Sequence, residues 1–258
     1  MSGGLFVGRR VLVTGAATGI GRATAEYLAT EGAGVFGVGL DGEEGRALAS
    51  AYEAKTPLLL FREADLTKES EVQAAVAAAV AALGGLDAVV NCAGIYATGK
   101  RLEDVSDAEW DGTIAVNLTA MFRVCRATLP LLRAAGGGSI VNIASVHAES
   151  TVPGVPAYAA SKAAIVGLSR QMALDYAADR IRVNSVLVGS VATRMTLDGL
   201  EEAGGPEAIG LSFDDNKIAR IANPREIATA IGFLLSDAAS FVTGSALLAD
   251  GGLTARLL

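Results

Sequence analysis

The stretch VLVTGAATGIG, residues 11–21, decides the fold. Its first residues form a short apolar run rich in valine, which is typical of a buried strand. The glycines that follow lead into a segment with helical spacing, in which Ile20, Ala23 and Tyr27 share one face. A glycine-rich turn between a strand and a helix presents backbone amides to an anion, so this stretch predicts the start of a dinucleotide-binding β-α-β unit.

Each glycine of this loop has its own expected role. Gly15 permits the sharp turn, Gly19 allows the backbone to approach a pyrophosphate, and Gly21 allows the helix to pack tightly against the strand. Thr18 and Ile20 complete the loop as further expected contacts of the dinucleotide. The spacing is G-x-x-x-G-x-G, and the alternative interpretation is a tight turn that serves packing alone.

The same alternation of short apolar runs and helical segments recurs along the chain. After residues 11–15 the expected strands are 34–40, 57–61, 86–91, 138–145, 180–188 and 245–250. The later expected helices are 69–83, 107–134, one around 157–165 and one at 224–235. Strands that are apolar on both faces and alternate with helices predict a doubly wound parallel α/β sheet, a Rossmann fold of about seven strands with helices on both faces. We expect a single domain over residues 1–258.

The composition argues against several classes of protein. The chain has 258 residues, 51% of them apolar, and a net charge of −7, so no nucleic-acid partner is expected. Cys92 and Cys125 lie in apolar runs without the spacing of a metal site or a disulfide framework. The apolar runs are too short to span a bilayer, and the first residues lack the pattern of a signal peptide. We therefore expect a soluble cytoplasmic protein with no metal site and no membrane partner.

Asp41 bears on the choice of coenzyme. It lies twenty residues after Gly21, where an acid usually accepts hydrogen bonds from the adenosine ribose. Neither residues 37–42 nor residues 16–18 include an Arg or Lys that would meet a 2′-phosphate. We therefore expect NAD(H) to be favoured over NADP(H). The alternative is that Asp41 is a solvated turn residue.

The stretch AYAASKAAI, residues 157–165, places Tyr158 and Lys162 four positions apart, which makes them neighbours on one face of a helix. Ser145 ends an expected strand and would meet them at the carboxyl edge of the sheet, where a ligand is expected. Catalysis near neutral pH requires the pKa of the phenol to fall by about 2–3 units. We expect the adjacent ammonium, with added positive charge from an oxidised nicotinamide, to supply this, so that Tyr158 acts as general acid and base while Ser145 holds the substrate oxygen. The alternative is a chance pair in which Lys162 extends into solvent and Tyr158 packs in the core.

With these residues in view, the chain resembles the short-chain dehydrogenase/reductase family along nearly its whole length. The matching residues keep the order and the distances of the family pattern: they are Thr14-Gly15-x-x-x-Gly19-Ile20-Gly21, Asp65-Leu66, Asn91-Cys92-Ala93-Gly94, Asn117, Ser145 and Tyr158-x-x-x-Lys162. The resemblance implies an NAD(P)-dependent oxidoreductase that interconverts a secondary alcohol and a ketone. It also implies that the catalytic residues are Asn117, Ser145, Tyr158 and Lys162.

The resemblance further assigns contacts with the coenzyme. The implied positions are Asp65 and Leu66 near the adenine, Asn91, Ala93 and Gly94 beside the adenosine ribose, Tyr158 and Lys162 at the nicotinamide ribose, and Thr193, with Val191 just before it, at the carboxamide. Asn117 is implied to hold a water that passes protons toward Lys162. Without the resemblance, Asp65 would be interpreted as a turn cap, Asn117 as a partner of backbone groups in a kinked helix, and Thr193 as the start of a helix.

Three positions depart from the family pattern. Cys92 replaces the usual asparagine, a change to a small residue that should leave the backbone path unchanged. Val188 precedes Gly189 where the family commonly has proline, so this turn loses a fixed φ. The usual NAD-selecting aspartate aligns better with Gly39 than with Asp41, which weakens the prediction for NAD(H).

The sequence gives less information on the substrate and the assembly. His147, together with Ser145 and Tyr158, is a candidate to bind a sugar, polyol or similar small hydroxy compound, and a structural histidine is the alternative. Residues 192–222 are expected to form a lid over the substrate, and a plain surface excursion is the alternative. Apolar residues on more than one side of the 107–134 segment predict self-association, and the resemblance implies a homo-oligomer, dimer or tetramer, to which the tail GLTARLL (252–258) can contribute.

Three other functions remain open at this stage. They are a catalytically silent, dinucleotide-binding regulatory protein, a 3-oxoacyl thioester reductase of the same family, and a methyltransferase with a similar nucleoside pocket. The set Asn117, Ser145, Tyr158 and Lys162 argues against the first and the last, because neither function needs a tuned phenol.

Overall fold

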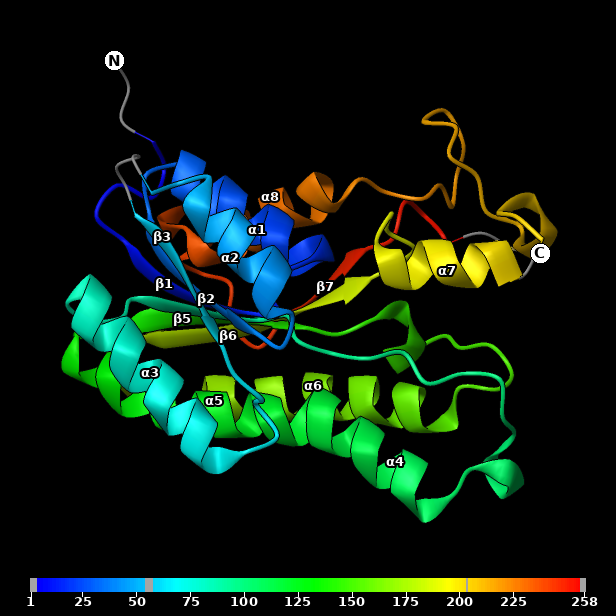
Figure 1. The fold of residues 1–258 in the computed structure, drawn as a ribbon, viewed down its shortest axis with the longest axis horizontal. Coiled ribbons are helices and arrows are strands. Elements are labelled where there is room, and N and C mark those ends of the chain that lie inside the picture. Colours follow the sequence, from blue (N-terminus) through cyan, green and yellow to red (C-terminus); the bar gives the residue numbers. More distant parts are fainter. Residues whose placement is uncertain (1–3, 54–57, 203, 256–258) are drawn as a thin grey trace.

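A parallel sheet forms the centre of the molecule (Figure 1). The computed structural model describes residues 4–53, 58–202 and 204–255. Within these residues, seven strands pair in the order β3-β2-β1-β4-β5-β6-β7, and each pairing is parallel. The strands are β1 Arg10–Thr14, β2 Gly34–Gly39, β3 Leu59–Glu63, β4 Ala88–Asn91, β5 Gly138–Ile143, β6 Ile181–Val188 and β7 Ala246–Ala249.

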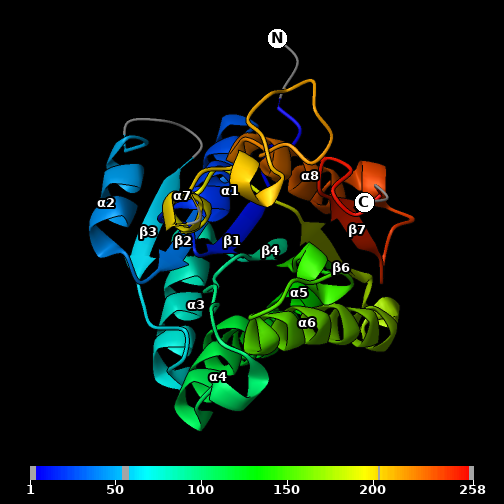
Figure 2. The same cartoon turned by 90° about the vertical axis from the view of Figure 1, so that its right-hand side faces the viewer.

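Helices cover both faces of the sheet, which confirms the predicted doubly wound α/β fold. They are α1 Gly19–Thr30, α2 Gly42–Ser50, α3 Glu69–Leu83, α4 Asp107–Ile114, α5 Ala120–Ala134, α6 Pro156–Asp175, α7 Arg194–Glu202 and α8 Pro224–Leu235. In Figure 1, α1, α2 and α8 lie above the sheet and α3, α4, α5 and α6 lie below it. Figure 2 views the carboxyl edge of the strands, with α7 in front of β1 and β2. No helix among the described residues is long and apolar enough to cross a membrane.

The strand side chains alternate between two apolar cores. Leu12 belongs to the core formed with α3, α5 and α6, whereas its neighbours Val11 and Val13 belong to the core formed with α1 and α8. Each of the three is at most 1% exposed. Successive side chains of a strand point to opposite faces, so a fully apolar run is what a sheet covered on both sides requires.

Helix α2 forms where the sequence analysis predicts none, and α7 begins directly after Thr193, as the alternative interpretation of that residue expects. In α2, Gly45 lowers the helix propensity, but a Cβ at this position would overlap the Phe61 ring, so the glycine lets α2 pack closely on β3. Asp41 caps α2 by accepting a hydrogen bond from the Glu44 amide at 3.2 Å. Tertiary packing and this cap therefore outweigh the weak propensity of the segment.

The helix predicted over 107–134 has an interruption. A π-helical segment, η2 (Ala115–Thr119), separates α4 from α5 and carries Asn117. Some strand ends also differ: the run predicted at 138–145 ends at Ile143, which leaves Ser145 just beyond the strand. The run predicted at 57–61 corresponds to β3, and Pro57 lies outside the described residues, as do residues 256–258 of the tail.

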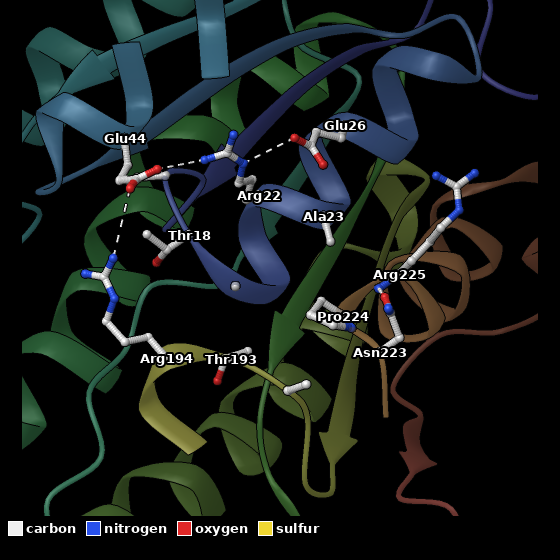
Figure 3. Close-up of a pocket in the computed structure, with 13 residues that line it drawn as sticks. Thr18, Arg22, Ala23, Glu26, Glu44, Thr193, Arg194, Asn223, Pro224 and Arg225 are labelled. Atoms are coloured by element: carbon white, nitrogen blue, oxygen red, sulfur yellow. Dashed lines mark hydrogen bonds and ion pairs between the residues drawn. The ribbon is translucent and has the colours of Figure 1, made fainter. Parts of the chain in front are cut away.

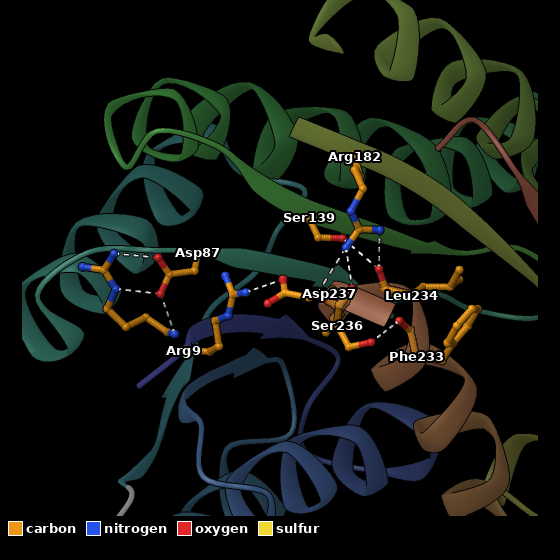
Figure 4. Close-up of polar contacts among 10 residues, drawn as sticks. Arg9, Asp87, Ser139, Arg182, Phe233, Leu234, Ser236 and Asp237 are labelled. Carbon is orange, nitrogen blue, oxygen red and sulfur yellow. Dashed lines mark hydrogen bonds and ion pairs between the residues drawn. The ribbon is translucent and has the colours of Figure 1, made fainter. Parts of the chain in front are cut away.

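Arg182, near the amino end of β6, holds the C-terminus of α8 (Figure 4). Its guanidinium donates to the carbonyls of Leu234 at 2.7 Å, Ser236 at 3.0 Å, Leu235 at 3.3 Å and Val242 at 3.3 Å. Helix ends leave carbonyls without partners, and a cation is favourable at a helix C-terminus. Burial lowers the pKa of Arg182, yet a guanidinium stays charged under all ordinary conditions.

Arg182→Met should lower the free energy of unfolding by about 2–3 kcal/mol, because main-chain carbonyls lose a charged donor. Urea unfolding followed by circular dichroism measures this change. Arg170→Met, at an exposed position on α6, is the matched control and should change stability by less than about 0.5 kcal/mol. Equal stability losses in the two variants would contradict the role assigned to Arg182.

Candidate active site

Two adjoining cavities open at the carboxyl edge of the sheet. The central cavity, of about 230 Å³, is lined by the glycine loop of residues 15–21 together with Ser145, Tyr158 and Lys162. The side cavity, of about 220 Å³, is lined by residues that follow β2 and β3, among them Asp41, Asp65 and Leu66. Gly15, Thr18, Ala93 and Gly94 line both cavities, so the two lie side by side across the strand ends.

The glycine loop forms a cradle of bare backbone. Gly15 and Gly19 adopt φ values of 65° and 54°, which side-chain-bearing residues rarely adopt. A Cβ at Gly15 would stand 2.9 Å from Ala93, and a Cβ at Gly21 would overlap the Gly15 carbonyl. The hydroxyl of Thr14 accepts hydrogen bonds from the amides of Cys92 at 3.1 Å and Ala93 at 3.2 Å, and thereby joins the loop to the end of β4. These residues fit the diphosphate of a dinucleotide.

The two acids of the side cavity also have local partners. The Asp65 carboxylate accepts from the Thr67 hydroxyl at 2.6 Å and the Thr67 amide at 2.9 Å, and these hydrogen bonds hold its pKa below the ordinary value. Asp41 caps α2. Each acid therefore stabilises a turn and at the same time lines the cavity, so the structural and the binding interpretations are compatible.

Val191 and Thr193 line the central cavity together with the glycine loop. The Thr193 methyl is the nearest group to Gly19, at 3.0 Å from where a Cβ would stand. Ile20 lines the same cavity. Thr193 also precedes α7 and so links the central cavity to the segment expected to act as a lid.

Asn91 lines neither cavity. Its side-chain amide donates to Asn142 at 2.8 Å and lies 3.3 Å from the Cys125 sulfur, in the interior between β4, β5 and α5. Its Oδ1 is buried and has no hydrogen-bond partner among the described residues. The strand register explains this orientation, because Asn91 and Asn142 are paired residues of β4 and β5. The side chain therefore supports the sheet edge from within.

Ser145, Tyr158 and Lys162 come from two elements and meet at the central cavity. Ser145 follows β5, while Tyr158 and Lys162 lie in the first turns of α6. The Lys162 Nζ atom lies 5.5 Å from the centre of the Tyr158 ring and donates to the Ile143 carbonyl at 3.0 Å. Lys162 is only 5% exposed, so it does not extend into solvent. Cys92 also lines this cavity, and burial raises the pKa of its thiol to about 12.

In the protein alone, the pKa of Tyr158 shifts in the opposite direction to the one expected with coenzyme bound. Burial raises the pKa of the Tyr158 phenol to about 12, and an interaction with the Ser145 hydroxyl opposes this rise. Burial also lowers the pKa of Lys162 to about 8. Desolvation is thus the largest influence on the phenol in the protein alone. The expected lowering relies on the positive charge of an oxidised nicotinamide as well as on Lys162, and it stays a prediction for the protein with coenzyme bound.

Asn117 is held by protein groups on both sides of its amide. Its Oδ1 accepts from the Ile95 amide at 2.8 Å, and its Nδ2 donates to the Ile95 carbonyl at 3.0 Å and to Ser161 at 3.1 Å. Ser161 donates in turn to the Tyr158 carbonyl at 2.7 Å. The side chain therefore joins the π-helical segment, the loop after β4 and the start of α6.

Two aromatic rings contact Tyr158. His147 lies with its ring centre 5.5 Å from that of Tyr158, and its Nδ1 shares a hydrogen bond with the Thr151 hydroxyl at 2.9 Å. Tyr96, which the sequence analysis missed, lies closer, at 4.7 Å and an interplanar angle of 89°. The available signal was its position two residues after Asn91-Cys92-Ala93-Gly94, a segment that ends at the site.

A third cavity, the outer pocket, shares Thr18, Gly19, Thr193 and Arg194 with the central cavity (Figure 3). In it Glu44 pairs with Arg22 at 2.9 Å and approaches Arg194 at 4.0 Å. Arg22 also pairs with Glu26 at 3.2 Å. Arg22, which lies in the first turn of α1 just after the glycine loop, is therefore already paired with two carboxylates.

Known proteins share this sequence and this fold. The family model described as "Enoyl-(Acyl carrier protein) reductase" matches residues 15–254. The 2-keto-3-deoxy-L-fuconate dehydrogenase of Xanthomonas campestris is 38% identical over 95% of this chain and 80% of its own length. The cyclopentanol dehydrogenase of a Comamonas species is 38% identical over 95% of this chain and 97% of its own. The crystal structure of levodione reductase superposes with a TM-score of 0.90 at 33% identity and covers 98% of this chain and 100% of the other.

Proposed function

The chain belongs to the short-chain dehydrogenase/reductase family, and on this basis we propose that it interconverts a small secondary alcohol and its ketone, with Tyr158 as general acid and base. Enzymes of this family use NAD(P)(H), and this chain is an oxidoreductase that acts on CH–OH groups. The observation that carries the catalytic assignment is the convergence of Ser145, Tyr158 and Lys162 on one cavity beside a glycine cradle.

The proton chemistry follows from the three side chains. In the oxidation direction the Tyr158 oxygen takes the proton of the alcohol, while the Ser145 hydroxyl holds the same substrate oxygen. Lys162, fixed by the Ile143 carbonyl, stabilises the ionised phenol. A bound nicotinamide would accept or supply the hydride, and in its oxidised form would add positive charge beside the phenol. Asn117 positions Tyr158 through its hydrogen bonds to Ser161 and to the backbone of Ile95.

The preference for NAD(H) forms part of the proposal. The start of α2 carries Asp41, Glu43 and Glu44, whose negative charges disfavour a 2′-phosphate near the side cavity. Arg22, a cation of the neighbouring outer pocket, is bound by Glu44 and Glu26, which weakens its attraction for such a phosphate (Figure 3). This arrangement supports NAD(H) even though Gly39 occupies the position of the usual aspartate.

Asp41→Ala should weaken NADH binding more than NADPH binding, by about five-fold in the ratio of the two dissociation constants, which corresponds to about 1 kcal/mol. Asp41→Asn keeps the cap of α2 and removes only the charge, so it should shift the ratio in the same direction without a loss of stability. Fluorescence titration gives both constants, and thermal unfolding gives the stability. An equal effect on both coenzymes would place the selection elsewhere.

The lid, the assembly and the cellular location complete the proposal. Within one coenzyme-binding domain, residues 192–222 would act as a lid, which is supported by apolar side chains exposed there, Met195 at 46% and Phe213 at 52%. Exposed Phe122 on α5 and Phe233 on α8 support a homo-oligomer, dimer or tetramer. The free thiols of Cys92 and Cys125 support a reducing, cytoplasmic location.

Binding and turnover experiments test the function. Titration with NADH, NADPH and S-adenosylmethionine should show binding of a nicotinamide coenzyme, and a panel of small sugars, polyols and cyclic alcohols should show coenzyme reduction with at least one substrate. Binding of S-adenosylmethionine alone would contradict the proposal. Coenzyme binding without turnover of any alcohol or ketone would favour the regulatory alternative.

A further inference from the structure

The rings of Tyr96 and His147 pack against the ring of Tyr158, and we call these three residues the aromatic corner. The ring centres of Tyr96 and Tyr158 lie 4.7 Å apart, those of His147 and Tyr158 5.5 Å, and those of Tyr96 and His147 6.0 Å. Both outer rings are nearly perpendicular to Tyr158, at 89° and 79°. Edge-to-face pairs at such distances are stabilising, so the corner is a packed unit.

Hydrogen bonds hold the backbone next to Tyr96. Asn117 binds both the amide and the carbonyl of Ile95, the residue before Tyr96. Asn117 is itself 1% exposed and is joined through Ser161 to the backbone of Tyr158. The backbone next to Tyr96 is therefore anchored beside Tyr158 by buried hydrogen bonds, and Tyr96 itself is 37% exposed.

The surface beside the phenol is mainly apolar. Ile95 and Met195 line the central cavity together with Tyr158, and they are 43% and 46% exposed. The Nδ1 of His147 is already engaged by Thr151. The described lining of the central cavity includes neither Tyr96 nor His147, so a substrate carbon framework would meet these two rings where it extends past Tyr158. There it would meet aromatic and aliphatic groups, and additional hydroxyl groups would lose water and find few polar partners.

We propose that Tyr96 is a specificity-determining residue, which makes the site favour secondary alcohols whose reacting carbon belongs to a compact carbocycle over open-chain polyols. The inference rests on the proposed function and deepens it. The C–H groups of a small ring pack against an aromatic face at little entropic cost, because the ring is already rigid. The aromatic face of Tyr96, and not its hydroxyl, provides this selection.

The test compares cyclopentanol, 2-pentanol and erythritol as substrates in steady-state kinetics with saturating coenzyme. The wild type should give the highest kcat/KM with cyclopentanol. Tyr96→Ala should lower the ratio of cyclopentanol to 2-pentanol by about ten-fold, mainly through KM. Tyr96→Phe should retain the wild-type ratio because it keeps the ring. Tyr176→Ala is the control and should leave the ratio unchanged, since Tyr176 caps the C-terminus of α6, about 27 Å along the helix from Tyr158.

Distinct outcomes separate this inference from the function on which it rests. An unchanged ratio in Tyr96→Ala, even with lower kcat for both alcohols, would overturn the inference and leave only a structural role for the ring. A fall in the cyclopentanol to 2-pentanol ratio of kcat/KM in Tyr96→Phe would overturn the inference, because the selection would then come from a hydrogen bond of the Tyr96 hydroxyl. Wild-type preference for erythritol would overturn the inference but support the oxidoreductase function. Failure to oxidise any alcohol with either coenzyme would overturn both.

Discussion

Tyr158→Phe should lower kcat by roughly 10²- to 10⁴-fold while leaving the dissociation constant of the coenzyme within about three-fold of the wild-type value. The phenyl ring can keep the contacts with Tyr96 and His147, since Tyr158 is 9% exposed and its ring lies within 4.7 Å and 5.5 Å of theirs, centre to centre. Only the transferable proton and the interaction with Ser145 are lost. The variant therefore separates proton transfer from binding.

Steady-state kinetics and fluorescence titration with NADH measure the two quantities. Tyr176→Phe makes the same chemical change at the other end of α6 and should behave like the wild type. Turnover of Tyr158→Phe within a few-fold of the wild-type rate would show that another group transfers the proton. A large loss of coenzyme affinity in the same variant would show that the hydroxyl serves mainly in binding.

The sequence was sufficient for the fold because the decisive signals are local. The apolar run of residues 11–13 alternates between two cores, and a strand buried on both faces must be apolar throughout. The loop glycines were identified from spacing alone, since close backbone approach permits no side chain. Ser145 meets Tyr158 and Lys162 because it follows the carboxyl end of β5, and the first turns of α6 lie at the same edge of the sheet.

The remaining features depend on tertiary packing that periodicity does not reveal. The orientation of Asn91 follows from its register with Asn142 across β4 and β5, and this pairing joins residues far apart in the chain. The contact between Tyr96 and Tyr158 arises where Asn117 holds the preceding residue, Ile95, against α6. Helix α2 depends on contact between Gly45 and Phe61.

The shift of the Tyr158 pKa shows the same limit for electrostatics. Spacing established that Lys162 would be near the phenol, and the structure places Nζ 5.5 Å from the ring centre. Spacing could not establish how far both groups are removed from water. Because desolvation disfavours each charged form, the pKa of Tyr158 rises to about 12 and that of Lys162 falls to about 8. The sign was therefore decided by burial and not by the pair.

Gly21→Ala should reduce the affinity for both coenzymes by at least about ten-fold and lower the free energy of unfolding by about 1–3 kcal/mol. A Cβ at this position would overlap the Gly15 carbonyl, and neither backbone group is a flexible side-chain end that can move aside. Either α1 must shift from the end of β1, or the turn at Gly15, whose φ is 65°, must open. Both changes displace the amides of the loop from the positions that hold a diphosphate.

Gly112→Ala is the matched control, since Gly112 is also a helical glycine, and no heavy atom within 4 Å would meet its Cβ. It should leave coenzyme affinity unchanged and raise the free energy of unfolding by about 0.5–1 kcal/mol through higher helix propensity. Isothermal titration calorimetry and urea unfolding compare the two variants. Wild-type affinity in Gly21→Ala, with the expected loss of stability, would mean that the tight turn serves packing alone and that the diphosphate is held elsewhere.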